Sequence, residues 1–573
     1  MRRKRSLPTA GLILLWVVLL VATWGRWGSV TDDCGRELSV ARDLALGKTL
    51  YSDVWYLYQP AGPYVNALLF RVFGIHLSVL YLAGAGAGLG SALLYLFCGL
   101  RLGSLGAGWA AGAILLVEAF VPSVFCFPLP YAYASVYGCF ASAIVLWCCI
   151  AALDSPRPWR MVVGASCAAA FAFSLKLEFG VGCWATLVVL LALFATRDSF
   201  GQVFGKWLLA ILPGVLLSVA MLAWCFSLRG PAFIFNENWI YTNQFNSTSV
   251  HWLASNGMIP TPRSLLKAAA SLPAVFLWVA YAWLAKRWGL GWKSLVAGII
   301  PAGVILALAA LSPEGQIAHI LFPPAMGAVD LAIACVLAWF LISGRKSPNL
   351  PLTMGACAAF LMGLRSLFGN AALGYAIYFQ GPVVLMLLVM AAALFDFVPA
   401  TWKRPAAALP FVATIFAVAI LTIPYYRTAS LRQPLANSFG TLRVPPQNLE
   451  PYRAALEFAK DAQGRGDLVS FVPEDTAFYF LTGHEIPTRF YQFTPGQILK
   501  RKISEELFRQ LERVRWVVWS NRRFPEYGEA EFGVDFDQDA GDYIKSHYRI
   551  VRKIPATQAD GWGAAIWERV PGL

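Results

Sequence analysis

Acidic residues and arginines are concentrated in residues 31–74, which follow the first long apolar segment of the chain. Asp32 and Asp33 are adjacent, Arg36 comes one helical turn later, and Asp53 lies further along the same stretch. A carboxylate at a membrane edge could deprotonate an acceptor hydroxyl or amine, and several together could hold a divalent cation. Asp33 could instead serve only as the N-cap of a helix. The first interpretation places the chemistry of the protein in this loop.

Two short helices are predicted to frame these acids. Leu38, Ala41 and Ala45 recur at helical spacing, polar side chains occupy the other face, and Gly47 ends the segment. An amphipathic helix of this kind is expected to lie along a membrane surface. A second helix follows a pair of prolines and is predicted to end near Gly74.

A second group of charged residues lies between the fifth and sixth apolar segments. Lys176 and Glu178 occur there in the sequence Phe-Ser-Leu-Lys-Leu-Glu-Phe-Gly. A charge between two tightly connected membrane spans is costly unless something pairs with it, which favours an anionic partner for Lys176. The alternative is that both side chains extend to the lipid headgroups. Three other residues, near the outer ends of spans or in outer loops, could line a pocket or be structural: Glu118, His319 and Arg365.

The composition identifies an integral membrane protein. The chain has 573 residues, of which 58% are hydrophobic and 14% charged, against the roughly 25% charged residues of soluble domains. Apolar segments long enough to span a bilayer recur between residues 10 and 424, and we predict about thirteen membrane-spanning helices. Their centres are predicted near Leu15, Leu89, Leu115, Val145, Ala170, Leu190, Val215, Leu277, Ile305, Val336, Phe360, Leu388 and Ile415.

The positive charges of the short loops predict the orientation. With Arg2, Arg3, Lys4 and Arg5 in the cytoplasm, alternate loops carry further basic residues, as the positive-inside rule requires. The N-terminus is then cytoplasmic, and Asp33 and the region after Pro424 lie outside the cell's inner (plasma) membrane. The basic residues of the inner loops are Arg101, Arg157, Arg160, Arg197, Lys206, Lys286, Arg287, Lys293, Arg345, Lys346, Lys403 and Arg404.

Two other features have simple explanations. The basic N-terminus and its apolar run could begin a cleavable signal peptide, but the run is long and no clear cleavage site follows it. The net charge of +14 is accounted for by basic loops that orient the protein and touch anionic lipid, so no nucleic-acid partner is inferred.

The chain divides into two domains at a change in composition. Residues 1–424 contain the apolar segments, and residues 425–573 are rich in charge and predicted to form a small α/β domain outside the membrane. Its strands are predicted at 468–472, 516–519, 548–554 and 564–568, and helices at 451–461 and 504–513.

The loop after the first span carries a family resemblance. Its acid is followed by Gly-Arg-Glu-Leu, a helix ending Leu-Ala-Leu-Gly-Lys, the sequence Leu-Tyr-Ser-Asp, and a helix ending Phe-Arg-Val-Phe-Gly. This pattern resembles the polytopic glycosyltransferases of the GT-C fold, in particular the protein O-mannosyltransferase and lipid A aminoarabinose transferase branch. Residues 478–490 resemble the extramembrane tail of bacterial members.

The resemblance implies roles for individual residues. It places the catalytic acid at Asp33 or its neighbour Asp32. It also implies that Lys176 binds the phosphate of the donor. The other residues that we expect to bind substrate are Arg36, Glu37, Asp53, Glu118, Glu178, His319 and Arg365. A divalent cation could bind at Asp32, Asp33 and Asp53, although three acids alone do not define a metal site.

One feature departs from the family pattern. Relatives often carry a second acid at the start of the fourth span, whereas residues 127–135 contain none, so either Glu118 substitutes or that role is absent.

The implied function is transfer of a sugar from a polyprenyl-phosphate donor to a lipid, glycan or protein acceptor on the outer face of the membrane. The alternative is a transporter or flippase of a lipid-linked or polar solute. Internal repeats and ionisable residues at mid-membrane would favour transport, whereas here the charges mostly lie at span ends.

Most of the 11 cysteines lie within apolar segments and are predicted to behave as small apolar residues. Cys34 and Cys126 are exceptions, because both fall near the outer surface. They could form a disulfide in an oxidising compartment.

The predicted orientation can be tested by labelling. A Ser347→Cys variant should react with a membrane-impermeant thiol reagent only from the cytoplasmic side, and Ser438→Cys only from outside, because the loops that contain them lie on opposite faces. The unsubstituted chain measures the background from native cysteines. Labelling of Ser347→Cys from outside in intact cells would reverse the orientation and move Asp33 to the cytoplasm.

Overall fold

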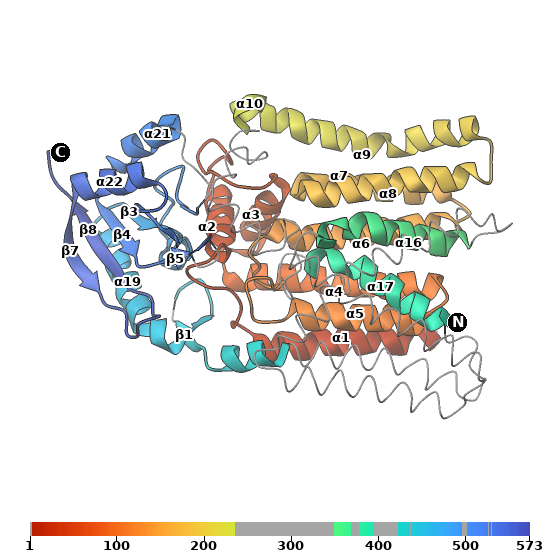
Figure 1. The fold of residues 1–573 in the computed structure, drawn as a ribbon, viewed down its shortest axis with the longest axis horizontal. Helices are drawn as coiled ribbons and strands as arrows, with labels where there is room; N and C mark the ends of the chain where they lie inside the picture. The colour runs from red at the N-terminus through yellow and green to blue at the C-terminus, as the bar shows by residue number, and fades with distance from the viewer. Residues whose placement is uncertain are drawn as a thin grey trace.

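The computed structural model describes residues 3–234, 349–367, 377–394, 422–435, 437–495, 501–524, 527–528 and 530–572. In this part of the chain a bundle of long, nearly parallel helices carries an α/β domain at one end (Figure 1). The N-terminus lies at the opposite end of the bundle from the α/β domain, and the helices α2 and α3 lie between the bundle and that domain.

The bundle makes this a multi-pass membrane protein. Among the described residues, six helices are long and apolar enough to cross a membrane, and three shorter apolar helices accompany them. The long ones are α1 (Arg3–Thr23), α4 (Leu77–Arg101), α6 (Tyr133–Ala152), α7 (Pro158–Leu175), α8 (Leu177–Ala195) and α9 (Phe200–Arg229). The shorter ones are α5 (Leu105–Ala119), α16 (Leu350–Gly363) and α17 (Ile377–Leu394). Two single turns follow helices of the bundle: α10 (Pro231–Ile234) follows α9, and η3 (Leu364–Leu367) follows α16.

Most of the predicted span centres lie inside these helices. Each described apolar helix contains one of the centres predicted from the sequence. The centres at Leu277, Ile305, Val336 and Ile415 lie outside the described residues, as does His319. The total of about thirteen spans therefore stays a prediction.

Small residues let the membrane helices approach closely. A Cβ atom added to Gly108 of α5 would lie 2.8 Å from the carbonyl oxygens of Tyr95 and Leu96 on α4. At Gly214 of α9 it would lie 2.3 Å from the carbonyl oxygen of Ser166 on α7. Such contacts replace the hydrophobic driving force that is missing between helices in lipid.

The loop after α1 forms the two predicted helices, α2 (Cys34–Ala45) and α3 (Ala61–Phe73). The position of α2 along the membrane surface stays a prediction, but its polar face is not exposed to water. Its polar residues Arg36, Ser39, Arg42 and Asp43 are all buried. The C-terminal domain covers this face, so its polar groups bind protein where the sequence pattern suggested headgroups and water.

The C-terminal domain is built on a four-stranded sheet of order β3-β4-β8-β7, in which β3 and β4 are parallel and the other pairs antiparallel. The strands are β3 (Val469–Val472), β4 (Trp516–Ser520), β7 (Tyr548–Ile554) and β8 (Ala564–Arg569), and each coincides with a predicted strand. The predicted helices are also present, as α19 (Pro446–Gly464) and α21 (Arg501–Leu511). The domain adds α20 (Ala477–Thr482), α22 (Gln538–His547), and two small pairs, β1 (Gln433–Leu435) with β2 (Leu442–Val444) and β5 (Arg523–Phe524) with β6 (Ala530–Glu531).

The domain is fastened to α2 by buried polar contacts. The Ser39 hydroxyl donates to the carbonyl of Thr476 at 2.8 Å, and the Arg42 guanidinium donates to the carbonyls of Tyr479 and His484. Asp43 pairs with Arg42 at 3.0 Å. Because buried polar groups are costly when unpaired, separating the domain from α2 would leave several of them without partners.

We predict that this contact is acid-sensitive through His484. Burial, and then the nearby Arg42 guanidinium, lower the pKa of His484 to about 4, below the roughly 6.5 of an exposed histidine. Between these values the unfolded chain binds the proton and the folded chain does not, so stability falls as pH falls through this window. The apparent melting temperature at a fixed heating rate should drop accordingly, by roughly 2–4 °C for each kcal/mol.

The matched comparison is His484→Gln, which should flatten this part of the pH profile. His547→Gln, on α22 away from the contact, should leave the profile unchanged. Burial raises the pKa of Asp475 to about 6, so protonation of Asp475 stabilises the folded chain as the pH falls. Because this effect is present in every variant, the quantity to compare is the difference in melting temperature between each variant and the parent. Equal acid sensitivity in His484→Gln and the parent would remove His484 from this role.

Candidate active site

Asp33 lies at the start of α2 with one oxygen held and one open. It occupies the N-cap position but its side chain makes no cap hydrogen bond, so the N-cap interpretation is wrong. Its Oδ1 receives hydrogen bonds from Arg36 Nη1 at 2.8 Å and Gln492 Nε2 at 2.7 Å. Both bonds fall on the same oxygen, and the side chain is 25% exposed. The carboxylate is thus fixed in orientation while Oδ2 can receive a proton.

The guanidinium of Arg36 is wholly buried beside this acid. Besides Asp33 it donates to the carbonyl of Tyr131 at 2.8 Å and, more weakly, to Gln492 Oε1 at 3.4 Å. It also lies over the rings of Tyr56 and Tyr58, with its central carbon 5.8 and 5.4 Å from their centroids. These contacts hold Asp33 in place, and the prediction that Arg36 binds substrate stays a prediction.

Glu37 is also buried. It accepts hydrogen bonds from the Tyr56 hydroxyl at 2.9 Å and the backbone N–H of Tyr133 at 3.0 Å, and it pairs with Arg36 at 3.4 Å. Burial raises the pKa of its carboxyl, and the neighbouring Arg36 partly offsets this effect. Glu37 has no exposed side-chain surface and lies behind Arg36, so its predicted contact with substrate stays a prediction.

Lys176, at the junction of α7 and α8, points inward. Only 8% of the residue is exposed, so the interpretation that it extends to the headgroups is wrong. Its amino group donates to the Tyr131 hydroxyl at 2.9 Å, with Ser135 Oγ at 3.5 Å. It also lies 4.7 Å from the centroid of the Tyr58 ring. These partners are neutral hydroxyls and aromatic faces, which orient an ammonium without cancelling its charge.

Two tyrosines join the acid and the lysine into one site. Tyr131 accepts from Arg36 through its carbonyl and from Lys176 through its hydroxyl, and Tyr58 lies against both cations. Asp33 and Lys176, which are far apart in sequence, are therefore linked through Arg36 and these two side chains. Residues 51–58 are rich in aromatic side chains, but the sequence does not indicate which of these rings contact the cations.

Glu178 and Arg365 also come together as an ion pair. Arg365 Nε lies 4.0 Å from Glu178 Oε1, and the Glu178 side chain is 37% exposed. Arg365 comes from η3, after α16, whereas Glu178 begins α8 two residues beyond Lys176. The predicted substrate-binding residues around Lys176 thus share one corner of the bundle.

The C-terminal domain completes the acid end of the site. Arg522 pairs with Glu474 at 3.3 Å and approaches Asp32 at 3.9 Å, and Gln492 bridges Asp33 and Glu474. Burial raises the pKa of Asp32, with Arg522 lowering it and Asp33 raising it. Sequence reasoning missed the residues of this domain because no pattern connects them to the first loop.

The remaining predicted residues lie elsewhere. Asp53 is exposed and accepts the backbone N–H of Thr49 at 2.7 Å, so it stabilises a local turn. Glu118, in the last turn of α5, makes no hydrogen bond or ion pair to Asp33 within the described part of the chain. Among the described residues, no group of three His, Cys, Asp or Glu could hold a metal, so Asp32, Asp33 and Asp53 do not form the suggested ligand set.

The suggested disulfide between Cys34 and Cys126 is absent. Both cysteines are free and buried, and both thiols donate to the carbonyl of Leu129, at 3.5 and 3.1 Å. Their role is to connect the start of α2 with the loop before α6.

No protein-family model matches the sequence, and no curated protein matches it. Two solved structures of the oligosaccharyltransferase AglB from Archaeoglobus fulgidus are similar in fold. The complex with an inhibitory peptide and a dolichol-phosphate matches with a TM-score of 0.51 and 12% identity, over 98% of this chain and 74% of that one. The complex with Zn and sulfate matches with a TM-score of 0.53 and 14% identity, over 96% and 72%.

ArnT from Cupriavidus metallidurans bound to undecaprenyl phosphate aligns over 99% of this chain and 98% of its own, with 14% identity, but its TM-score of 0.45 is too low to establish a common fold. The AglB similarity defines the architecture. At 12–14% identity the similarity shows the fold alone: this chain shares the GT-C fold of AglB, as the resemblance in the first loop implied.

Proposed function

We propose that the protein is a membrane glycosyltransferase that moves a sugar from a polyprenyl-phosphate donor to an acceptor on the outer face of the membrane. The observation that carries the proposal is a connected cluster. In it Asp33 is held at one oxygen, the hydrogen-bond partners of Lys176 are neutral hydroxyls, and both ends of the cluster meet Tyr58 and Tyr131. The cluster lies where the helix bundle meets the C-terminal domain, within reach of both lipid and external acceptors.

Lys176 is suited to hold the phosphate of the donor. A buried ammonium whose hydrogen-bond partners are uncharged attracts an anion strongly, because little solvent screens it. Arg365 lies beside it in a long ion pair with Glu178 and could turn toward a bound phosphate. The apolar helices around this corner provide the surface that an isoprenoid chain requires.

Asp33 is suited to activate the acceptor. Its Oδ2 takes the proton of an acceptor hydroxyl as that oxygen attacks the anomeric carbon of the donor sugar. The bond from the anomeric carbon to the phosphate oxygen breaks, and Lys176 stabilises the charge that develops on the departing polyprenyl phosphate. Attack opposite the leaving group inverts the anomeric configuration.

The named ligands of the similar structures agree with this scheme. AglB was solved with a dolichol-phosphate, a lipid phosphate of the class proposed here, and with a peptide. The acceptor of this chain is a lipid, glycan or protein. The N-terminus of this chain is predicted to be cytoplasmic. With that orientation, the site and the C-terminal domain lie on the outer side of the inner (plasma) membrane.

A divalent cation fits this site poorly. AglB was solved with Zn, but the described residues here offer Asp32 and Asp33 without a third ligand. Arg36 and Arg522 also lie beside the two acids and would repel a cation. The proposed mechanism therefore uses protein groups for acid–base chemistry and charge stabilisation.

We expect Lys176→Ala to weaken binding of polyprenyl phosphate by about tenfold or more, the scale of one lost charge-assisted hydrogen bond. Lys176→Arg should keep part of the affinity, because it keeps the charge but not the geometry. Binding can be measured by titrating the lipid into the full chain in detergent. The matched control is Lys206→Ala, an exposed basic residue of α9; equal affinities in Lys176→Ala and this control would contradict the phosphate assignment.

We expect Asp33→Asn to reduce turnover by about a hundredfold or more, because an amide cannot act as a base. Asn can still accept the bonds of Arg36 and Gln492, and Glu37 still pairs with Arg36, so the chain should fold. Turnover is measured as release of polyprenyl phosphate from a panel of polyprenyl-phosphate sugars.

Asp53→Asn, an exposed acid of the same loop, is the matched control and should keep full activity. Asp32→Asn in parallel shows which of the adjacent acids is the base. Full activity in both Asp32→Asn and Asp33→Asn would rule out the first loop as the source of the base. Movement of intact donor lipid across vesicles without release of polyprenyl phosphate would instead indicate a transporter.

A further inference from the structure

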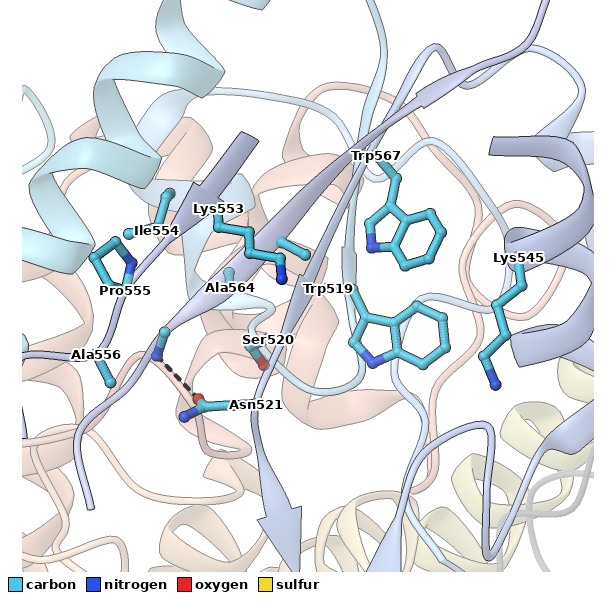
Figure 2. Close-up of a pocket in the computed structure, with 12 residues that line it drawn as sticks. Trp519, Ser520, Asn521, Lys545, Lys553, Ile554, Pro555, Ala556, Ala564 and Trp567 are labelled. Atoms are coloured by element: carbon cyan, nitrogen blue, oxygen red, sulfur yellow. Dashed lines mark hydrogen bonds between the residues drawn. The ribbon is translucent and has the colours of Figure 1, made fainter. Parts of the chain in front are cut away.

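A hollow of about 430 Å³ lies in the C-terminal domain, apart from the cluster around Asp33. Figure 2 shows two indole rings, Trp519 and Trp567, on one side of it and the turn from Ile554 to Ala556 on the other. Its size is within the usual range for small-ligand pockets.

The strand register explains why the hollow exists. Trp519 on β4 and Lys553 on β7 both pair with Ala565 of the central strand β8. The three side chains therefore form a row on one face of the sheet, with the smallest in the middle. Two strand spacings separate the outer residues by about 10 Å, so a large side chain stands at each side of a floor made by a methyl group.

The walls of the hollow are rigid on the aromatic side. The ring of Trp519 lies 5.7 Å from that of Trp567 and packs edge-on against Phe532 at 5.2 Å. Lys545 of α22 reaches to 5.7 Å from the Trp519 centroid. On the opposite side, the Asn521 carboxamide accepts the N–H of Gly563 at 2.9 Å, which fixes the loop before β8 (Figure 2).

We propose that this hollow binds an anionic sugar residue of the acceptor, either a uronate or a sugar phosphate. An indole face carries a negative quadrupole and packs well against the apolar C–H face of a sugar ring. Lys553 supplies positive charge, and of the described residues that line the hollow none is acidic. Lys545 contributes less, because its amino group donates to the Gly533 carbonyl at 3.3 Å and lies 4.0 Å from Asp542. A sugar ring lying on Trp519 with its carboxylate or phosphate toward Lys553 satisfies both features.

The hollow is also close to the proposed active site, and this inference rests on the proposed function for its biological role. Asn521 and Arg522 directly follow β4, and Arg522 approaches Asp32 at 3.9 Å. Three residues of extended chain span at most about 10 Å between Trp519 and Arg522. In the proposal, the sugar held on Trp519 is part of the acceptor whose hydroxyl reaches Asp33.

The test measures the binding of glucuronate, glucose 6-phosphate and neutral glucose to the full chain in detergent. Saturation-transfer NMR detects the contact, and calorimetry gives the affinity. We expect both anionic sugars to bind more tightly than glucose. Lys553→Gln should weaken them by about tenfold and leave glucose unchanged, because it removes one charge-assisted contact. Ala565→Leu should abolish binding of all three by filling the floor of the hollow.

The matched control is Arg552→Gln, which removes the same charge from the neighbouring position of β7, in register with Ile566 on the other face of the sheet. An equal loss in Arg552→Gln, full competition by inorganic phosphate, or no sugar binding would each overturn the proposal. Transfer by the parent is measured alongside: sugar binding without transfer would contradict the proposed function alone, and transfer without sugar binding would contradict the hollow alone. Asp33→Asn should bind the sugars as the parent does, because Asp33 does not line the hollow.

Discussion

The structure around the site depends on one buried guanidinium, that of Arg36. A charge with no solvent exposure is costly unless paired and fully hydrogen-bonded, and Arg36 meets this requirement with groups from three separate parts of the chain. Asp33 belongs to its own helix, Tyr131 to the loop before α6, and Gln492 to the C-terminal domain. Because satisfying this one group needs all three, the helix bundle, the first loop and the C-terminal domain hold one another in position.

Arginine suits this role for a geometric reason. Its planar fork presents several N–H donors in fixed directions, and its faces can lie against aromatic rings. Here the edges meet a carboxylate, a carbonyl and an amide, while the faces meet Tyr56 and Tyr58. A lysine could pair with Asp33 but could not also order the two rings, and Tyr58 is the ring that extends the network to Lys176.

Local pattern predicted the elements well and their surroundings poorly. Periodicity and turn residues located α2, α3, the described spans, and the strands of the C-terminal sheet, because those signals are carried by neighbouring residues. The burial of the polar face of α2 could not be predicted, because nothing near it in sequence reveals the covering domain. The partner of Asp33 lies 459 positions away, at Gln492, a separation that no local rule addresses. For Lys176 the sequence left burial and headgroup contact open, and only the fold decides for burial.

The two charged centres of the site differ in a way that physical chemistry makes useful. Around Asp33, carboxylates and guanidinium groups nearly balance, so the acid is oriented without strongly attracting a further ion. Around Lys176, the first neighbours are hydroxyls and an aromatic face, so positive charge is left for an incoming anion. In the proposed function, a donor phosphate is therefore drawn to the lysine end and not to the acid end. Tyr131 contributes to both ends, because its carbonyl accepts a hydrogen bond from Arg36 and its hydroxyl accepts one from Lys176. One residue thus sets the distance that the proposed donor and base must share.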